Sequence, residues 1–228
     1  TGTNNGDDIT IFAKPDPEIS GDESVCAQNE YTYSSKSRAD DANILWQVEG
    51  GVIQGNSTDA EVDVLWGDAQ EARLTLIHTI PDPGCTDTTE KTITIHPLPE
   101  VGISGDTAVC HGSEIKYQAD QADASQFNWI VTNGTILGSK IDSTVDIQWN
   151  SVGEGNVKLI QTKSQTGCAD STDIDILINP LPEVGIIGEN DVCQGSISNY
   201  QANKTDSSLF KWIVTNGTIQ GTEKQKTV

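Results

Sequence analysis

The sequence contains no methionine, few aromatic residues and few positive charges. Only 13 lysine and arginine residues stand against 34 aspartate and glutamate residues, which gives a formal net charge of −21. A chain this acidic repels the phosphates of nucleic acids and the surface of an anionic membrane, so neither is an expected partner. No stretch approaches the roughly 18 apolar residues that a membrane-spanning helix needs, and membrane insertion is not expected.

The usual signatures of catalysis are also missing. The sequence has no G-x-S-x-G, no H-E-x-x-H and no glycine-rich phosphate loop. Its three histidines, His78, His96 and His111, stand at positions where the repeats described below carry different residues. A repeated active site would repeat its base, and a single site would need a nucleophile beside it. We therefore expect no catalytic residue and no enzyme activity.

Residues that favour strands are abundant. The chain holds 24 threonines, 24 isoleucines and 15 valines, but only 10 leucines. Side chains branched at Cβ pack well on a pleated sheet and are less suited to helices. The 228 residues are long enough for two domains, or for three if each is a small all-β unit.

The chain repeats itself. The stretch from Pro97 to Val145 and the stretch from Pro180 to Val228 align without a gap and are identical at 29 of 49 positions. A more diverged copy begins at Pro15, and equivalent residues are 83 or 84 positions apart. Such a fixed period is typical of a tandem array of structural repeats.

This period divides the chain into four parts. Residues 1–14 are expected to be the last strand of a preceding copy, and residues 15–97 and 98–180 to be complete copies. Residues 181–228 are expected to be an incomplete copy, since Val228 aligns with Val145. The whole is interpreted as a window of a longer array.

Within a copy, apolar residues alternate with polar ones. Phe127, Trp129 and Val131 share one face of a stretch, and Ile174, Ile176 and Ile178 share one face of another. This period of two predicts short strands with one buried face. About seven such strands with tight turns and no helix predict a β-sandwich. The tryptophans are expected to be core residues: Trp46, Trp66, Trp129, Trp149 and Trp212.

The cysteines follow the same period. The first complete copy has Cys26 and Cys85, the second has Cys110 and Cys168, and Cys193 begins a third pair. Because equivalent positions should pair alike, we predict the disulfides Cys26–Cys85 and Cys110–Cys168, with the partner of Cys193 beyond the chain end. Metal ligation would need four ligands within reach, which two isolated cysteines per copy do not supply, so no metal site is expected. Disulfides indicate an oxidising, extracytoplasmic location.

Taken together, one motif recurs in each copy. It reads P-x-P-E-x-x-I-x-G-x-x-x-V-C-x-G, then Y, then W-x-V-x-x-G-x-I-x-x-G, then V-D-V-x-W, G-C and I-x-I-x-P. It resembles the PKD-like, immunoglobulin-like repeats of very long cell-surface proteins of Bacteroidetes, which include gliding-motility adhesins exported by the type 9 secretion system. The ordinary W-D-F-G-D-G signature of PKD domains is replaced here, for instance by the residues from Trp129 to Gly134, so no binding residues are carried over.

The resemblance implies an all-β fold of tandem immunoglobulin-like or PKD-like sandwiches, and an extracellular position on a bacterial surface. The implied partners are neighbouring repeats of the same chain and the machinery of secretion and surface attachment. Proline-rich joints, such as Pro97-Leu98-Pro99 and Pro180-Leu181-Pro182, link the copies without a flexible stretch. Proline fixes φ and favours extended backbone, so the copies are expected to form a rod.

Two functions remain open at this stage. The first is a structural or adhesive segment of a long secreted surface protein, acting as a stalk or filament. The second is a carbohydrate-binding module, with surface polysaccharide as its partner. Sugar-binding modules present exposed aromatic rings, and only Phe12 and Tyr31 lie outside the repeated, inward-facing aromatic set. Exposed positions also differ between copies, as in Lys116 and Asn199, which favours the stalk.

Calcium is the one cofactor considered. Acidic residues gather near the joints, among them Asp16, Glu18, Glu100 and Glu183, but no D-x-D-x-D-G string occurs. Calcium needs six to eight converging oxygens, whereas scattered acids on so acidic a chain are usually a solvated surface. We predict that a chelator leaves the thermal unfolding midpoint unchanged, as measured by circular dichroism. A midpoint that falls with the chelator and recovers with added calcium would contradict this.

Overall fold

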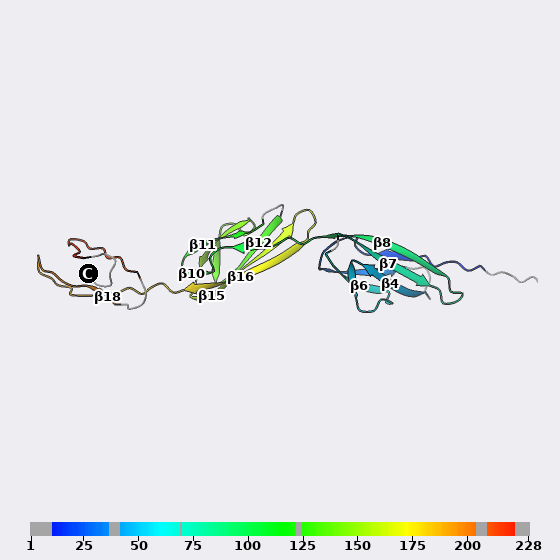
Figure 1. The fold of residues 1–228 in the computed structure, drawn as a ribbon, viewed down its shortest axis with the longest axis horizontal. Helices are drawn as coiled ribbons and strands as arrows, with labels where there is room; N and C mark the ends of the chain where they lie inside the picture. Colours follow the sequence, from blue (N-terminus) through cyan, green and yellow to red (C-terminus); the bar gives the residue numbers. More distant parts are fainter. Residues whose placement is uncertain (1–10, 37–41, 69, 122–124, 204–208, 222–228) are drawn as a thin grey trace, which may run out of the picture.

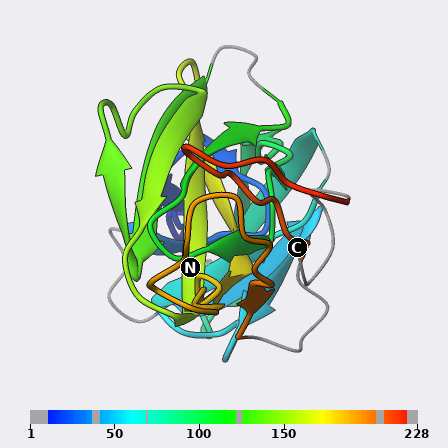
Figure 2. The same cartoon turned by 90° about the vertical axis from the view of Figure 1, so that its left-hand side faces the viewer.

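The computed structural model describes residues 11–36, 42–68, 70–121, 125–203 and 209–221. All regular secondary structure in these ranges is β-strand or tight turn, with no helix among the described residues. The copies follow one another along the longest axis of the molecule in Figure 1, and the end-on view in Figure 2 looks along that axis. The predicted all-β fold with tandem sandwiches is confirmed.

The first copy is a sandwich of two four-stranded sheets. One sheet has the order β1-β3-β6-β5, formed by β1 (Glu18–Ser20), β3 (Glu30–Lys36), β6 (Glu61–Trp66) and β5 (Gly51–Gln54). The other has the order β2-β8-β7-β4, formed by β2 (Ser24–Cys26), β8 (Thr86–His96), β7 (Glu71–Thr79) and β4 (Asn43–Glu49). The chain changes sheets between β1 and β2, and β2 then runs parallel to β8.

The second copy has the same topology. One sheet has the order β9-β11-β14-β13, formed by β9 (Ile103–Ser104), β11 (Glu114–Ala119), β14 (Thr144–Trp149) and β13 (Gly134–Leu137). The other has the order β10-β16-β15-β12, formed by β10 (Ala108–Cys110), β16 (Ala169–Asn179), β15 (Gly153–Lys163) and β12 (Ser125–Thr132). As in the first copy, the short strand β10 runs parallel to the closing strand β16.

The described part of the third copy contains much less regular structure than the other two copies. Its described residues contain only β17 (Ile186–Ile187) and β18 (Gln201–Ala202), which pair with each other. Trp212 is half-buried rather than a core residue, so this part of the prediction differs from the structure. The strands that cover Trp129 in the second copy include residues 146–179, and the sequence to Val228 contains no counterpart of them.

Each sandwich encloses one core made by alternating side chains. In β6, for example, Val62, Val64 and Trp66 are buried while the residues between them are not. The predicted core tryptophans of the two complete copies, Trp46, Trp66, Trp129 and Trp149, are all buried. Burial of such large apolar rings is the main stabilising contribution in a sandwich of this size.

Two of these rings also hold a loop in place. The indole Nε1 of Trp46 donates a hydrogen bond to the carbonyl of Asp59 at 2.9 Å, and that of Trp129 donates to the carbonyl of Asp142 at 2.9 Å. The polar edge of each buried ring is thereby satisfied, as a buried N–H requires. The loop after the fifth strand is closed over the sheet in the same way in both copies.

A tyrosine in each copy makes a second repeated contact. Tyr33 lies edge to face with Trp66, with ring centroids 5.9 Å apart, and Tyr117 lies likewise with Trp149 at 6.1 Å. The Tyr33 hydroxyl donates to the carbonyl of Asp22 at 3.0 Å. Burial raises the pKa of Tyr33 to about 12, so the hydroxyl stays protonated and remains a donor at neutral pH.

One core position differs between the copies in a way that can be tested. His78 of β7 is buried and shares a hydrogen bond of 2.7 Å between its Nε2 and Ser35 Oγ. The equivalent residue of the second copy is Gln161, also buried, whose Nε2 donates to Ser125 Oγ at 3.0 Å. A histidine and an amide therefore fill the same place.

Because burial lowers the pKa of His78, the folded first copy resists protonation that the unfolded chain accepts below about pH 6.5. The unfolded state then binds more protons, so stability is present above that pH and is lost as the pH falls toward 5. We predict that His78→Gln, which imports the residue of the second copy, reduces this loss in urea unfolding compared at pH 7 and pH 5. An equal loss in both proteins would contradict the prediction.

Candidate functional site at the joint between copies

The two cysteines of the first copy lie at opposite ends of its sandwich. Cys26 is the last residue of β2 and is paired with His96, the last residue of β8. Cys85 directly precedes Thr86, the first residue of β8. This strand has 11 residues, which at ~3.4 Å per residue separates its ends by about 35 Å. A disulfide needs Cα atoms within roughly 7 Å, so the predicted Cys26–Cys85 bond is wrong.

The second copy repeats this separation. Cys110 is paired with Asn179 at the end of β16, and Cys168 directly precedes Ala169 at its start. The strand again has 11 residues. The predicted Cys110–Cys168 bond is wrong for the same reason.

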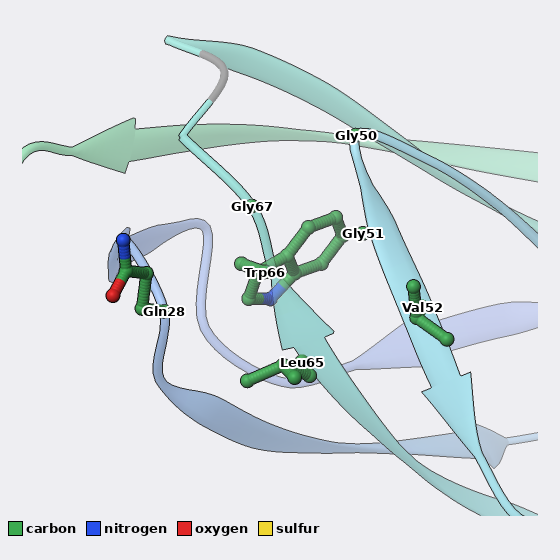
Figure 3. A pocket seen from close by; sticks show the side chains of 7 residues that line it. All are labelled: Gln28, Gly50, Gly51, Val52, Leu65, Trp66 and Gly67. Atoms are coloured by element: carbon green, nitrogen blue, oxygen red, sulfur yellow. The ribbon is translucent and has the colours of Figure 1, made fainter.

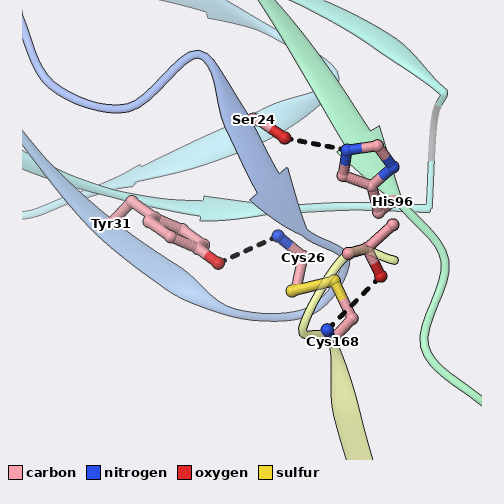
Figure 4. The surroundings of a disulfide bond; sticks show 6 residues. Ser24, Cys26, Tyr31, His96 and Cys168 are labelled. Atoms are coloured by element: carbon pink, nitrogen blue, oxygen red, sulfur yellow. Dashed lines mark hydrogen bonds between the residues drawn. A yellow bond between two sulfur atoms is a disulfide. The ribbon is translucent and has the colours of Figure 1, made fainter. Parts of the chain in front are cut away.

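The structure instead joins Cys26 of the first copy to Cys168 of the second. Their Cα atoms are 5.5 Å apart, and 142 residues separate them in the sequence. Figure 4 shows the bond between the end of β2 and the turn that leads into β16. Of the described cysteines, Cys85 is partly exposed, Cys110 and Cys193 are exposed, and all three are thiols. The expectation that the chain carries a disulfide is confirmed, whereas its connectivity is between copies.

Polar contacts surround the Cys26 half of this bond. The backbone N–H of Cys26 donates to the hydroxyl of Tyr31 at 2.9 Å, and Ser24 Oγ shares a hydrogen bond of 2.8 Å with His96 Nε2 (Figure 4). The sequence marks Tyr31 only as a ring outside the repeated aromatic set, and Ile115 stands at its place in the second copy. No repeat signal could have found it.

The connecting segment is packed at both ends. Leu98 lies against the first core, Val101 lies against the second, and Pro99 between them is buried. At the following joint the equivalent residues, Leu181 and Val184, are 57% and 77% exposed. The joint that carries the disulfide is therefore also the joint whose apolar residues are covered.

A shallow hollow lies at the same end of the first copy (Figure 3). Its lining consists of Gln28, Gly50, Gly51, Val52, Leu65, Trp66 and Gly67. Trp66 is only 1% exposed, and Gly51 lies against its ring so closely that a Cβ there would meet the ring at 2.8 Å. The hollow therefore offers no aromatic face on which a sugar could stack.

No group of three or more histidine, cysteine, aspartate or glutamate side chains in the described ranges is placed to hold a metal ion. No helix in the part of the chain that the structure describes is long and apolar enough to span a membrane. The joint, with its disulfide and its packed connecting segment, is therefore the candidate functional site.

Comparison with known families supports the repeat. Residues 96–178 match the model of the PKD-like domain family. This range holds the second sandwich nearly from end to end, so the second sandwich is similar to PKD-like domains. No curated protein gave a significant match.

Several solved structures are weakly similar to this chain. The fibronectin(III)-like modules of Clostridium thermocellum CbhA are 12% identical over 72% of this chain and 95% of theirs, with a TM-score of 0.35. Drosophila N-cadherin is 11% identical over 75% of this chain and 50% of its own, with a TM-score of 0.33. An I-band fragment of titin is 9% identical over 93% of this chain and 83% of its own, with a TM-score of 0.34. Scores this low add nothing to the fold described above.

We predict that the double variant Cys26→Ser/Cys168→Ser unfolds at a lower denaturant concentration than the parent chain. The chain-entropy model gives up to about 5 kcal/mol for a closed loop of this length, since the bonded residues are 142 positions apart. Guanidinium unfolding followed by tryptophan fluorescence measures the change.

The matched control is Cys85→Ser/Cys110→Ser, which removes the same number of sulfur atoms and should leave the midpoint unchanged. Equal losses in both double variants would mean that the bonds run within copies after all.

Proposed function

We propose that this chain is a stalk segment of a long secreted bacterial surface protein, in which tandem sandwiches act as an extended and stiff spacer with an adhesive surface. The observation that carries the proposal is the covalent bond between consecutive copies, Cys26 to Cys168. A disulfide that serves only to stabilise one domain would lie inside that domain. A disulfide across the joint instead restricts how one domain moves relative to the next, and a stiff spacer requires this restriction.

The joint supports this role through its packing as well. Leu98 and Val101 engage opposite cores, and Pro99 is buried between them, so the connection is short and apolar rather than free. The net charge of −21 adds a long-range effect. Strong like charge keeps a long filament soluble and disfavours its collapse onto itself. The copies are proposed to stand end to end as a rod.

The proposed location is the outer surface of a bacterial cell. A disulfide and a PKD-like repeat are both characteristic of proteins outside the cytoplasm. The motif resemblance extends the proposal to Bacteroidetes, to gliding-motility adhesins and to export by type 9 secretion. Neighbouring repeats and the secretion and attachment machinery are then its partners, and catalysis has no part in this role.

The rival function, a carbohydrate-binding module, has less support. The repeated tryptophans of the complete copies are buried, Tyr31 is engaged at the joint, and the hollow beside Trp66 presents no ring face. Phe12 is 53% exposed and stands before the first sandwich, so it forms no platform with these rings.

Small-angle X-ray scattering of the chain tests the spacer. Each sandwich should add on the order of 35–40 Å to the long dimension, about one long strand at ~3.4 Å per residue. We predict an elongated particle, and a more flexible one for Cys26→Ser/Cys168→Ser. A compact particle, with the two sandwiches folded side by side, would rule out the spacer.

A glycan array tests the rival. The stalk predicts no saturable binding to neutral or acidic polysaccharides. Tight binding that is lost on substitution of exposed strand residues, such as Lys116→Ala, would replace the stalk with a recognition module.

A further inference from the structure

The bond between Cys26 and Cys168 uses one cysteine from each complete copy and leaves Cys85 and Cys110 as thiols at the two outer ends of the pair. We propose that these thiols are bonding sites for neighbouring copies. Cys110 bonds the Gly-Cys turn of the copy that follows, and Cys85 bonds the first cysteine of the copy that precedes. Every joint of the array is then crossed by a disulfide. This rests on the proposed stalk function only in requiring that copies continue in tandem.

The backbone presents Cys110 in the same way as Cys26. Each ends a short strand that runs parallel to the closing strand and is paired with that strand's last residue, His96 or Asn179. The next residue donates to the carbonyl of that partner, at 2.9 Å in the first copy and 2.8 Å in the second. The residue after that donates to the carbonyl of the core tryptophan, Trp66 or Trp149, at 2.9 and 2.8 Å.

The backbone likewise presents Cys85 in the same way as Cys168. Ile80 N–H donates to the Cys85 carbonyl at 2.9 Å, and Lys163 N–H donates to the Cys168 carbonyl at 2.9 Å. The glycine before each cysteine, Gly84 or Gly167, donates back across the turn at 3.0 or 2.8 Å.

Both of these glycines have positive φ, +90° and +75°, a conformation in which glycine carries no steric penalty. The three residues before each glycine differ completely between the copies, being 81–83 in one and 164–166 in the other. The two copies therefore share the backbone conformation that presents the cysteine to a neighbouring copy, although the sequences of the turns differ.

Burial distinguishes the joints in the expected way. Cys26 and Cys168 are buried at 8% and 0% exposure, whereas Cys110 is exposed. At the joint beside Cys110, Leu181 and Val184 are exposed, although their counterparts Leu98 and Val101 are packed. A complete copy after this joint would supply both the sulfur and a second core for these apolar residues to pack against.

The chemistry is ordinary thiol–disulfide exchange. Cys110 and its partner thiol lose two electrons and two protons and form one S–S bond, while a disulfide oxidant such as oxidised glutathione is reduced to two thiols. An extracytoplasmic compartment provides such an oxidant.

Completing the third copy tests the proposal. Because Val228 aligns with Val145, residues 146–179 are appended directly after Val228, which adds a second copy of Cys168. The extended chain is oxidised with glutathione, blocked with maleimide and mapped by mass spectrometry of non-reduced peptides. We expect Cys26–Cys168 to persist and a new bond to link Cys110 with the appended cysteine. Maleimide labelling of Cys110 should fall from complete to background.

A second extension uses complete copies only. Residues 98–179 are placed before Pro15 in place of residues 1–14, so that Asn179 precedes a proline as it does at Pro180. The added copy of Cys110 should bond Cys85, and Cys26–Cys168 should be unchanged. This second extension tests the proposal whether or not the appended third copy folds.

The control is Cys110→Ser in the first extension, where the appended cysteine should remain a thiol. A bond between the appended cysteine and Cys193, a free appended cysteine beside a folded third copy, or covalent oligomers in place of an internal bond would each overturn the proposal. Small-angle scattering of the extended chain tests the stalk function separately. An elongated particle that lacks the new bonds would contradict the proposed disulfides at every joint but would agree with the proposed spacer.

Discussion

The length of the strand that closes each sandwich is the constraint on which the rest depends. In each copy, one cysteine lies beside the last residue of the closing strand, β8 or β16, and the other directly precedes its first residue. Because these strands are 11 residues long, the two cysteines of one copy cannot meet. A bond can then form only between the trailing end of one copy and the leading end of the next. The packed connection through Leu98, Pro99 and Val101 is the apolar counterpart of that bond. A distance inside one domain thus decides how two domains are connected.

Much of the fold was predictable because it follows from local periodicity. Alternation of buried and exposed residues identified strands such as β12 and β16, and the repeated tryptophans marked the two cores. The disulfide pairing was predicted wrongly, because the equivalence of copies requires only that all pairs be alike. It does not say whether a pair lies within one copy or spans two. The sequence does contain the length of the closing strand, as the 11 residues between Cys85 and Pro97. This length excludes a bond between Cys26 and Cys85 only once β2 is known to run parallel to β8, with Cys26 beside the last residue of that strand.

Other features were beyond the reach of repeat reasoning for the opposite reason, since they are not repeated. Tyr31 supports the backbone of Cys26, while Ile115 stands at its place in the second copy. His78 and Gln161 fill one buried position with different chemistry. Trp212 shares its neighbours in sequence with Trp129 and still is not enclosed, because burial is a property of the whole sandwich and not of the strand that bears the ring.

The parallel pairing of β2 with β8 has a mechanical consequence. Both strands end at the joint, one in Cys26 and the other in the residue before Pro97, and both are continuous with the next copy, through sulfur or through the peptide chain. Tension along the array therefore pulls two neighbouring strands in the same direction. The two strands are not pulled past each other, so the hydrogen bonds between β2 and β8 are not placed under shear. The force is shared by two strands of the sheet and does not peel a single edge strand away from it.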